Sequence, residues 1–500
     1  MTTNDSLRAA MAGGLPVLPA ARIAGRAVHV CDTSQRSAIY NASTGAMIGW
    51  QETASAAQID EAVQAARAAF DQWRATPPAL RGAILRTVAE RVEEARTSLV
   101  ELQMRVSGKP RAEAGTDVSD VAATFAYYAG VCNEAALFDA EPVALPDAAV
   151  LAERFYDPVG VAALIVPWNF PMVTTAWKLA PALAAGCTAV LKPSELTSPA
   201  EHALLDLLAQ AGVPEGVVNV VNGGAEVGAR LTTHPLVDKI SFTGSTAAGR
   251  HVMHAAAEDM KRVTLELGGK SALIVREDAD VDLAVSLAMG GAFTNSGQMC
   301  SATARILVHD HVYRKFMAAF ETAVRALVVA PPETSGAMMG PLISSAHRMR
   351  VQALVERGMA EGARVAFWGQ VSDQVMVEEA GFFMAPIVVA EPTADNVLWT
   401  DEVFGPVACV KSFRTDDEAI ALANGTRYGL VATVVTENDE MARHYRRRLK
   451  TGLVWHNTPQ LIFAQTGWGG FGLSGIGREL GLAGLRSYQE LRHAIAPAPR

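Results

Sequence analysis

A cysteine and a glutamate in two small-residue loops are the side chains of this chain best suited to covalent chemistry. Cys300 lies in Thr294-Asn-Ser-Gly-Gln-Met-Cys-Ser301, and Glu266 lies in Leu265-Glu-Leu-Gly-Gly-Lys270. Both loops adjoin apolar segments, where a polar side chain is unusual and suggests a function. A thiolate attacks carbonyl carbon, and a carboxylate can activate the water that releases an acyl group. The pair therefore predicts acyl transfer through a cysteine thioester.

Three further loops place polar side chains beside apolar segments, and each admits two interpretations. Asn169, in Pro167-Trp-Asn-Phe-Pro171, suits an oxyanion donor, but it also suits the pairing of backbone groups in a turn. Lys192-Pro-Ser-Glu195 could hold ribose hydroxyls or form a surface ion pair. Gly244-Ser-Thr-Ala-Ala-Gly249 opens a helix after a strand, which favours a phosphate site or a plain tight turn. No single loop decides its own function.

Strands that alternate with helices must position these loops. Polar loops follow the apolar strands expected at 159–166, 188–191, 217–221, 239–242 and 263–265. This alternation is typical of a buried parallel sheet. Open sheets of this kind bind ligands beyond the carboxyl ends of their strands. The sequence therefore predicts an α/β fold with a ligand site along that edge.

Helices and a second α/β unit flank this sheet. Residues 55–107 are expected to form three helices, with a Ser55–Gln58 capping box at the start and a stop at Gly108. The tail at 486–495 alternates like a strand and is expected to pair outside its own domain. After residue 270 we expect a helix at 312–328 and strands at 306–308, 364–367, 408–411 and 430–435.

Length and composition narrow the class of protein. Five hundred residues exceed one ordinary core and predict two or three structural units. The formal charge of −9 argues against a nucleic-acid surface. Five widely spaced cysteines without a Cys-x-x-Cys pair favour a reducing compartment and no metal framework. With no signal-like N-terminus and no apolar run of membrane-spanning length, a cytoplasmic, soluble protein is expected.

Seven motifs occur in order along the chain: Pro167-Trp-Asn-Phe-Pro171, Lys192-Pro-Ser-Glu195, Phe242-Thr-Gly-Ser-Thr246, Glu266-Leu-Gly-Gly-Lys270, Gly297-Gln-Met-Cys300, Glu402-Val-Phe-Gly-Pro406 and Gly469-Gly-Phe-Gly-Leu-Ser-Gly475. Together they resemble the NAD(P)-dependent aldehyde dehydrogenase superfamily across nearly the whole chain. The segments 300–305, 468–470 and 474–481 are most similar to its betaine-aldehyde and aminoaldehyde dehydrogenase branch.

The resemblance implies a three-part fold. A Rossmann-like coenzyme domain would comprise 21–135 and 159–267, and an α/β catalytic domain would comprise 268–482. A small β oligomerisation flap would combine 136–158 with 483–500, and residues 1–20 would be a flexible N-terminus. The flap strand would join a neighbouring subunit's sheet, so the resemblance implies a homo-oligomer, either a dimer or a dimer of dimers.

The same resemblance assigns the chemistry. Cys300 would attack the aldehyde, and the Asn169 amide together with the Cys300 backbone N–H would hold the oxyanion. Hydride transfer to the nicotinamide would leave a thioester, which water activated by Glu266 would hydrolyse. A nearby helix terminus and the charge of the cofactor are expected to favour the thiolate. Lys178 and Glu479 match a proposed proton relay, with a structural ion pair as the open alternative.

The cofactor implied is NAD, with NADP as the alternative, and no metal is implied. Glu195 favours NAD because a carboxylate repels a 2′-phosphate. The resemblance assigns Lys192, Ser194 and Glu195 to the adenosine ribose, Ser245 and Trp168 to the pyrophosphate, Glu402 and Phe404 to the nicotinamide end, and Val166, Gly223, Phe242 and Gly244 to the cleft.

The substrate is left between two kinds of aldehyde. Phe170, Trp177 and Trp455 match an aromatic box of the betaine-aldehyde and aminoaldehyde branch. Such rings bind a quaternary ammonium through cation–π attraction worth roughly 0.5–2 kcal/mol per ring. The alternative is a tunnel packed for an aliphatic or aromatic aldehyde. The chain departs from the branch pattern around this site at Thr294, His456, Gly467 and Gly472, and Phe170 stands where Tyr is more typical.

Two other classes of protein fit less well. A CoA-acylating relative typically lacks the water-activating glutamate, so Glu266 argues against that class. A non-catalytic protein on the same fold would be expected to have lost Cys300, Asn169, Glu266 or Glu402. The expected partner is a small-molecule aldehyde, with neither nucleic acid nor membrane.

Overall fold

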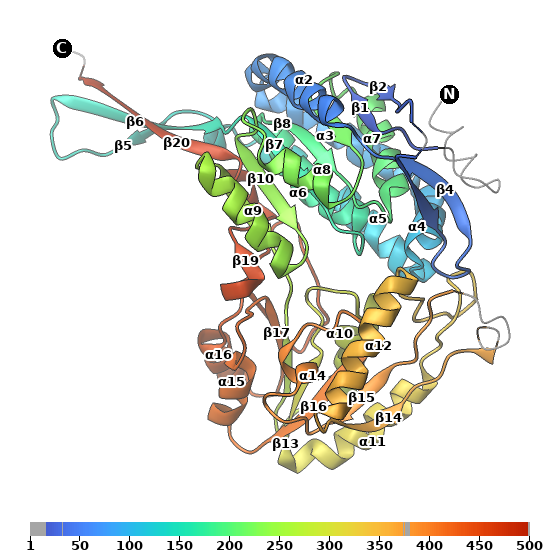
Figure 1. Ribbon diagram of the computed structural model, residues 1–500. Helices are drawn as coiled ribbons and strands as arrows, with labels where there is room; N and C mark the ends of the chain where they lie inside the picture. Colours follow the sequence, from blue (N-terminus) through green and yellow to red (C-terminus); the bar gives the residue numbers. More distant parts are fainter. Residues whose placement is uncertain (1–16, 33, 374, 376–380, 499–500) are drawn as a thin grey trace.

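Two α/β bodies lie one above the other, and a long β flap projects from the upper one (Figure 1). The computed structural model describes residues 17–32, 34–373, 375 and 381–498. The expected flexible N-terminus, 1–20, lies outside these residues except for 17–20. Within the described part of the chain, no helix combines the length and apolar character needed to cross a membrane.

The upper body is built on an eight-stranded sheet with a parallel centre. Strands β11, β10, β7, β8 and β9 run parallel, as predicted from their continuous apolar character, while β19, β1 and β2 are antiparallel edge strands. In sheet order the strands are β19 (Gly475–Ile476), β11 (Arg262–Glu266), β10 (Lys239–Thr243), β7 (Val161–Ile165), β8 (Thr188–Lys192), β9 (Val218–Val221), β1 (Ala21–Ile23) and β2 (Arg26–Val28).

Helices cover this sheet and begin where the sequence predicts. The Ser55–Gln58 capping box is present, and the chain leaves the third helix through Gly108 at φ 73°. The helices of this body are α2 (Ala56–Ala75), α3 (Pro78–Glu94), α4 (Arg96–Ser107), α5 (Arg111–Val131), α6 (Pro171–Ala185), α7 (Ser198–Gln210), α8 (Ala225–Thr232), α9 (Thr246–Glu258) and α17 (Gly481–Arg486), with a short 3-10 turn η1 (Ala135–Leu137).

The lower body is a seven-stranded sheet, parallel apart from its edge strand β14. In sheet order its strands are β14 (Arg364–Trp368), β15 (Ile387–Ala390), β16 (Val407–Phe413), β13 (Arg305–His309), β12 (Ala272–Val275), β17 (Val431–Val435) and β18 (Leu453–His456). Its helices are α10 (Val281–Phe293), α11 (Asp310–Ala326), α12 (Ser345–Ala360), α14 (Val397–Thr400), α15 (Asp416–Asn424) and α16 (Asp439–Arg448), with 3-10 turns η2 (Thr294–Gly297) and η3 (Gly472–Ser474).

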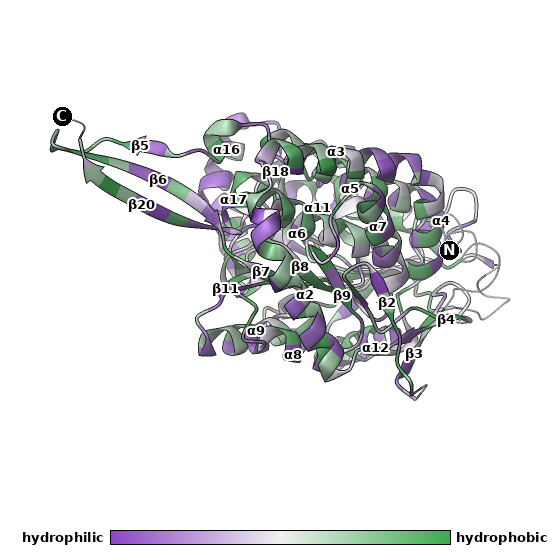
Figure 2. Cartoon of the chain, turned by 90° about the horizontal axis from the view of Figure 1, so that it is seen from above, coloured by the Kyte–Doolittle hydropathy of each residue, from purple (hydrophilic) through white to green (hydrophobic). Residues whose placement is uncertain are grey.

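The flap is a three-stranded antiparallel sheet. The tail strand β20 (Gln489–Pro497) pairs along its whole length with β6 (Val150–Pro158), which also pairs with β5 (Glu141–Val143). Figure 2 shows the flap extending well beyond the body of the molecule. A separate hairpin joins β3 (Arg36–Tyr40) to β4 (Met47–Glu52). The tail therefore forms a strand outside the two main sheets, as expected from its alternation.

One segment lies where the sequence did not place it. Gly475 and Ile476 fall within the expected catalytic domain, 268–482, yet β19 hydrogen-bonds to β11 of the coenzyme sheet. Leu267 N also donates to Ser474 O at 3.0 Å. The chain thus returns late to the strand that ends at Glu266. This return brings Glu479 beside residues that precede it by more than 200 positions.

Candidate active site

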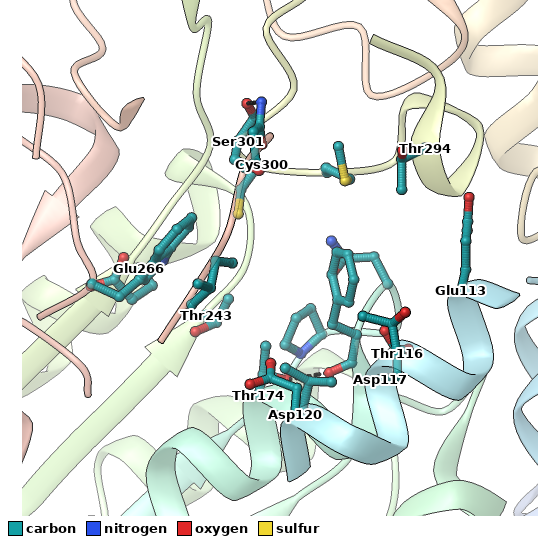
Figure 3. A pocket seen from close by; sticks show the side chains of 18 of the residues that line it. Glu113, Thr116, Asp117, Asp120, Thr174, Thr243, Glu266, Thr294, Cys300 and Ser301 are labelled. Atoms are coloured by element: carbon teal, nitrogen blue, oxygen red, sulfur yellow. Dashed lines mark hydrogen bonds between the residues drawn. The ribbon is translucent and has the colours of Figure 1, made fainter. Parts of the chain in front are cut away.

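A large cavity, about 890 Å³, opens between the two bodies. Its floor is the carboxyl edge of the coenzyme sheet, at Thr243 and Glu266, and its opposite wall carries Cys300 (Figure 3). Parallel strands bring their carboxyl ends to one edge, which is why loops far apart in sequence meet here. Of the residues predicted from sequence, the cavity is lined by Cys300, Glu266, Asn169, Glu479, Trp168, Phe170, Trp177, Gly244, Ser245, Glu402 and Phe404.

The turn before Cys300 is held in an unusual backbone conformation. Asn295, Ser296 and Gly297 have φ values of 50°, 56° and 71°, and such left-handed runs are costly for residues other than glycine. The side chain of Asn295 donates to Asn169 O at 3.0 Å. Glu113 of α5 accepts the Asn295 backbone N–H at 3.0 Å. These bonds compensate the strain and set the turn beside the Asn169 loop.

The side chain of Asn169 also forms a hydrogen bond to the segment before Cys300. Its Nδ2 donates to Gln298 O at 2.9 Å, which uses one of the two hydrogens of the amide. The second hydrogen has no acceptor within the described chain, and Asn169 lines the cavity. The arrangement places an amide donor and the nucleophile loop in direct contact.

The thiol of Cys300 does not have the lowered pKa expected from sequence. Burial, together with the carboxyl groups of Glu402 and Glu266, raises the pKa of Cys300 to about 12. Burial has the largest effect, and the two acidic side chains act in the same direction. In the protein without nucleotide, little of this thiol is ionised near neutral pH.

Alkylation of Cys300 tests this electrostatic setting. In nucleotide-free protein carrying Cys31→Ser, the rate of Cys300 modification by iodoacetamide should rise about tenfold per pH unit between pH 7 and 10. Cys31 is removed because it is exposed, whereas Cys132, Cys187 and Cys409 are buried. Peptide mass spectrometry would follow the modified residue. A rate that levels off below pH 8 would contradict the raised pKa.

Glu266 is the last residue of β11 and is buried at the cavity floor. Neither of its carboxylate oxygens has a hydrogen-bond partner among the described residues. Burial and the neighbouring Glu479 raise its pKa well above the usual value for a glutamate. An acid with a raised pKa is a better base when ionised, which suits proton abstraction from water. Three residues later, Gly269 must be glycine, because a Cβ atom there would collide with Cys300 O.

Lys178 and Glu479 form a buried ion pair next to Glu266. Lys178 Nζ also donates to Thr243 Oγ1 at 2.7 Å and to Ser241 Oγ at 3.2 Å. Glu479 Oε2 is buried without a partner in the described chain, and Glu479 lines the cavity. The geometry is compatible with either predicted role, a proton relay or a structural ion pair.

The residues assigned to the adenosine end lie along the same sheet edge. Lys192 ends β8, and its Nζ lies 3.5 Å from Glu195 Oε2. Ser245 caps α9 by accepting the Ala248 N–H at 3.2 Å. Val166, Ser194, Gly223 and Phe242 lie at or just beyond the carboxyl ends of β7, β8, β9 and β10.

Glu402 and Phe404, assigned to the nicotinamide end, also line the cavity. Glu402 Oε1 accepts the Gly269 N–H at 2.9 Å, and burial raises the pKa of Glu402 to about 7. Phe404 meets Trp168 edge to face, with ring centroids 5.4 Å apart. His347 and Arg350 of α12 also line this end, and nothing in their sequence context had singled them out.

Comparison of the sequence with known proteins identifies the family of this chain. Residues 29–494 match the aldehyde dehydrogenase family. The chain belongs to the aldehyde dehydrogenase family. Betaine aldehyde dehydrogenase 1 of Oryza sativa subsp. japonica is 40% identical over 464 residues, which cover 92% of this chain and 91% of that protein. Peroxisomal aminoaldehyde dehydrogenase 1 of Malus domestica is 40% identical over 460 residues, 91% of each.

A solved structure gives the same result for the fold. Betaine aldehyde dehydrogenase from Staphylococcus aureus, in complex with NAD+, superposes with a TM-score of 0.92 at 34% identity, over 96% of this chain and 94% of that one. The family and fold class predicted from the seven motifs are therefore confirmed.

The aromatic residues of this aldehyde dehydrogenase differ from the predicted box. Phe170 and Trp177 line the cavity, and so does Trp468, whose ring centroid lies 5.4 Å from that of Trp177. Trp455 is not among the described lining residues; it packs 6.4 Å behind Trp468 and donates its indole N–H to Leu461 O at 2.9 Å. His456 also faces away, with its Nε2 3.0 Å from Thr436 O.

Three other residues, Thr294, Gly467 and Gly472, also depart from the branch pattern. Thr294 lines the cavity, while Gly472 opens η3 at φ 59°, a conformation that favours glycine. At Gly467 the structure shows open space, with only Ala483 Cβ at 3.8 Å from a built side chain. Nothing in the structure explains why this position differs.

An acidic helix face in the cavity was missed by the sequence analysis. Glu113, Asp117 and Asp120 of α5 project into the cavity across from Cys300 (Figure 3). Burial raises the pKa of Glu113 and of Asp120 to about 7 in each case. Their spacing of four and then three residues puts them on one helical face, a signal that the sequence contains. Periodicity alone could not tell that this face borders a cavity.

A lysine occupies part of the same region. Lys109 Nζ lies 2.6 Å from Asp117 Oδ2 and 3.7 Å from the centroid of the Phe170 ring. One face of Phe170 is therefore already covered by a cation of the protein. Glu113 and Asp120 form no ion pair within the described chain, although the charge of Lys109 lowers the pKa of both.

Proposed function

We propose that this protein oxidises an aldehyde with a cationic tail, preferably an aminoaldehyde, to its carboxylate with NAD as acceptor. Cys300 is the nucleophile, Asn169 and the Cys300 N–H hold the oxyanion, and Glu266 activates the hydrolytic water. The single observation that carries the proposal is the acidic face of α5, which lies in the same cavity as these three residues.

The charges favour a cationic substrate. Three carboxyl groups and one lysine leave the far wall of the cavity with excess negative charge once Glu113 and Asp120, whose pKa values are about 7, are ionised. In this partly buried setting, one charge pair a few ångströms apart contributes on the order of 1–3 kcal/mol. A primary ammonium can donate hydrogen bonds to carboxylates, and a trimethylammonium cannot. The acids therefore favour an aminoaldehyde, with betaine aldehyde as the second candidate.

The aromatic rings support a narrower cage than the sequence predicted. Trp177 and Trp468 offer faces and edges to the cavity, while Lys109 covers Phe170. Part of the cation–π attraction is thus used within the protein. An aliphatic or aromatic aldehyde is the alternative substrate, because these rings would also pack an apolar tail.

The cofactor proposal depends on the sheet edge and on the relatives. Lys192, Ser194 and Glu195 would hold the adenosine ribose, and Ser245 and Trp168 would meet the pyrophosphate. Glu402 and Phe404 would position the nicotinamide end, with His347 and Arg350 alongside. Bound NAD supplies the hydride acceptor, and its positive ring would offset the acids that raise the pKa of Cys300. The Staphylococcus aureus relative holds NAD+ on the same fold.

Asp120→Asn should discriminate between the two substrate classes. The kcat/KM for 4-aminobutyraldehyde should fall about tenfold, a loss of roughly 1.4 kcal/mol, because one carboxylate facing the ammonium is removed. The kcat/KM for hexanal should stay within about twofold. Steady-state NADH formation with 4-aminobutyraldehyde, betaine aldehyde, benzaldehyde and hexanal provides the measurement. Equal losses with all four aldehydes would contradict a cationic substrate.

The preference should also depend on pH. The pKa of Glu113 and that of Asp120 are about 7, so both acids lose a proton between pH 6 and 8. The ratio of kcat/KM for 4-aminobutyraldehyde to that for hexanal should therefore rise over this interval. In Asp120→Asn the rise should be smaller, since only Glu113 still titrates there. A ratio that is independent of pH would argue for the apolar alternative.

We further propose a homo-oligomer in the cytoplasm. The projecting flap leaves β20 and β5 as edge strands, and Leu491 and Ile495 of β20 are exposed apolar residues. The five free cysteines agree with a reducing compartment. Size-exclusion chromatography with light scattering would separate dimer from tetramer.

A further inference from the structure

Two side chains of α12 hold three consecutive backbone carbonyl groups of the loop that carries Glu402 and Phe404. His347 Nε2 lies 2.7 Å from Phe404 O, and Arg350 Nη1 donates to Val403 O at 2.9 Å. Arg350 Nη2 donates to Glu402 O at 3.2 Å. A carbonyl oxygen can only accept, so His347 Nε2 carries the hydrogen of its bond. Each carbonyl group of this run therefore has a side-chain donor from one helix.

The two donors share a face of α12 because they are three residues apart. The helix is capped by Ser344, whose hydroxyl accepts the His347 N–H at 3.2 Å. On the same face, the buried Val351 packs against Gly405, where a Cβ atom would lie 2.7 Å from Val351 Cγ1. Helix α12 therefore contacts the 402–405 loop through both polar and apolar side chains.

The 402–405 loop has a backbone that needs such support. Phe404 has a φ of 59°, a left-handed conformation that is costly for a bulky residue. The carbonyl group of this same residue is the one that His347 holds. The loop also lies directly against the turn before Cys300, because a Cβ atom at Gly297 would collide with Gly405 O. A shift of the loop would therefore move its side chains relative to Cys300.

The ring of His347 packs against both aromatic side chains at this end of the cavity. Its centroid lies 5.2 Å from that of Trp168 and 6.0 Å from that of Phe404, in each case edge to face. Burial, with a smaller effect from the charge of Arg350, lowers the pKa of His347 to about 4. The ring is thus uncharged near neutral pH and can be packed in this way without burying a charge. It serves as a fixed neutral donor.

We propose that His347 and Arg350 are positioning residues for hydride transfer, which hold the 402–405 loop where the nicotinamide must lie beside Cys300. The inference rests on the role proposed above for the side chains of this loop. In that step the C–H bond of the Cys300 hemithioacetal breaks, and the hydride reduces NAD+ to NADH. The electron pair of the oxyanion then closes the thioester carbonyl. A misplacement of about 1 Å can cost ~10²-fold in such a step.

Three substitutions of His347 separate the donor from the ring. His347→Leu removes the donor, His347→Gln places an amide N–H at about the reach of Nε2, and His347→Asn carries the same amide one methylene shorter. The single-turnover rate of NADH formation should fall about tenfold or more in the leucine and asparagine variants, and the glutamine variant should stay within about threefold of the wild type. The loss should be equal with 4-aminobutyraldehyde and hexanal, because the loop positions the cofactor rather than the aldehyde tail.

Binding of NAD should separate from this loss of rate. The Kd of NAD, measured by quenching of tryptophan fluorescence, should change by less than about threefold in every His347 variant. The residues proposed to hold the adenosine lie at the edge of the coenzyme sheet and not on the 402–405 loop. A general loss of structure would instead weaken binding and lower the melting temperature.

Hydrogen exchange in the protein without nucleotide gives a readout that does not depend on turnover. Amides of the 402–405 loop should exchange about tenfold faster or more in His347→Leu and in Arg350→Met. Arg350 is exposed, so its variant carries the test should His347→Leu not fold. Arg357→Met is the matched control, since Arg357 pairs with Glu361 and has no described hydrogen bond to the loop. Its exchange and its rate should match the wild type.

Two results would overturn the proposal. One is wild-type exchange of the 402–405 loop in both His347→Leu and Arg350→Met. The other is a glutamine variant as slow as the leucine variant with wild-type exchange in both, because the ring would then act on the nucleotide directly. Failure of the assigned nicotinamide end is distinct. Phe404→Ala would then form NADH at the wild-type rate, although exchange of the loop would still respond to His347→Leu.

Discussion

Cys300→Ala is expected to reduce NADH formation from every aldehyde by about 10⁵-fold or more, because no other thiol of the chain reaches the cavity. The substitution removes the atom that forms the covalent intermediate, so hydride transfer has no hemithioacetal to act upon. Absorbance of NADH at saturating aldehyde and NAD measures the loss. Binding of NAD should persist, since the residues proposed to hold the adenosine lie along the sheet edge.

The control for this experiment is a second cysteine substitution. Cys31→Ala changes an exposed thiol outside the cavity and should leave kcat within about twofold. An unchanged melting temperature would show that Cys300→Ala is folded. Turnover by Cys300→Ala at the wild-type rate would remove the enzyme interpretation altogether, as would failure of the wild type to form NADH with any aldehyde.

Glu266→Gln is expected to separate the two halves of the reaction. Acylation should still release about one NADH per active site in a burst, because the nucleophile and the oxyanion donors are intact. Steady-state turnover should then fall by ~10²–10⁴-fold, since the amide cannot take a proton from the attacking water. Stopped-flow absorbance resolves the burst, and mass spectrometry should detect the acyl group on Cys300.

Glu201→Gln is a matched control for this result. Glu201 is a buried glutamate whose two oxygens also lack a partner in the described chain, but it lies outside the cavity. Burial raises its pKa well above the usual value, as it does for Glu266, and an amide keeps the shape of the side chain. Both the burst and the steady-state rate should match the wild type. A loss of steady-state turnover without a burst in Glu266→Gln would place Glu266 in acylation instead.

Much of the coenzyme body could be predicted from sequence because its signals are local. Continuous apolar strands such as 161–165 indicate a sheet buried on both faces, and the Ser55–Gln58 box marks a helix start within four residues. The loops that carry Asn169, Glu266 and Cys300 were recognised because each motif is contiguous in the chain. Family membership followed from their order.

The features that sequence analysis missed depend on contacts between distant segments. The acidic face of α5 has the spacing of a helix surface, and only the packing of the lower body against it turns that surface into a cavity wall. Trp455 and Trp468 are both buried tryptophans late in the chain, and which of them meets the cavity depends on how the loop after β18 folds back. A motif match cannot make that distinction.

The electrostatics of the site also depend on contacts between distant segments. A nearby helix terminus and the cofactor charge were expected to favour the thiolate, whereas without nucleotide burial raises the pKa of Cys300, and Glu402 and Glu266, from segments more than 130 positions apart, raise it further.

The sequence by itself therefore determined the family, the reaction class and the parallel sheet, because residue type and short-range order suffice for these. Only the tertiary structure decided which acidic side chains line the cavity and which carboxyl groups lie near Cys300. Charge interactions and burial depend on distances through space, and those distances are set by strand register and by the packing of the two bodies rather than by position along the chain.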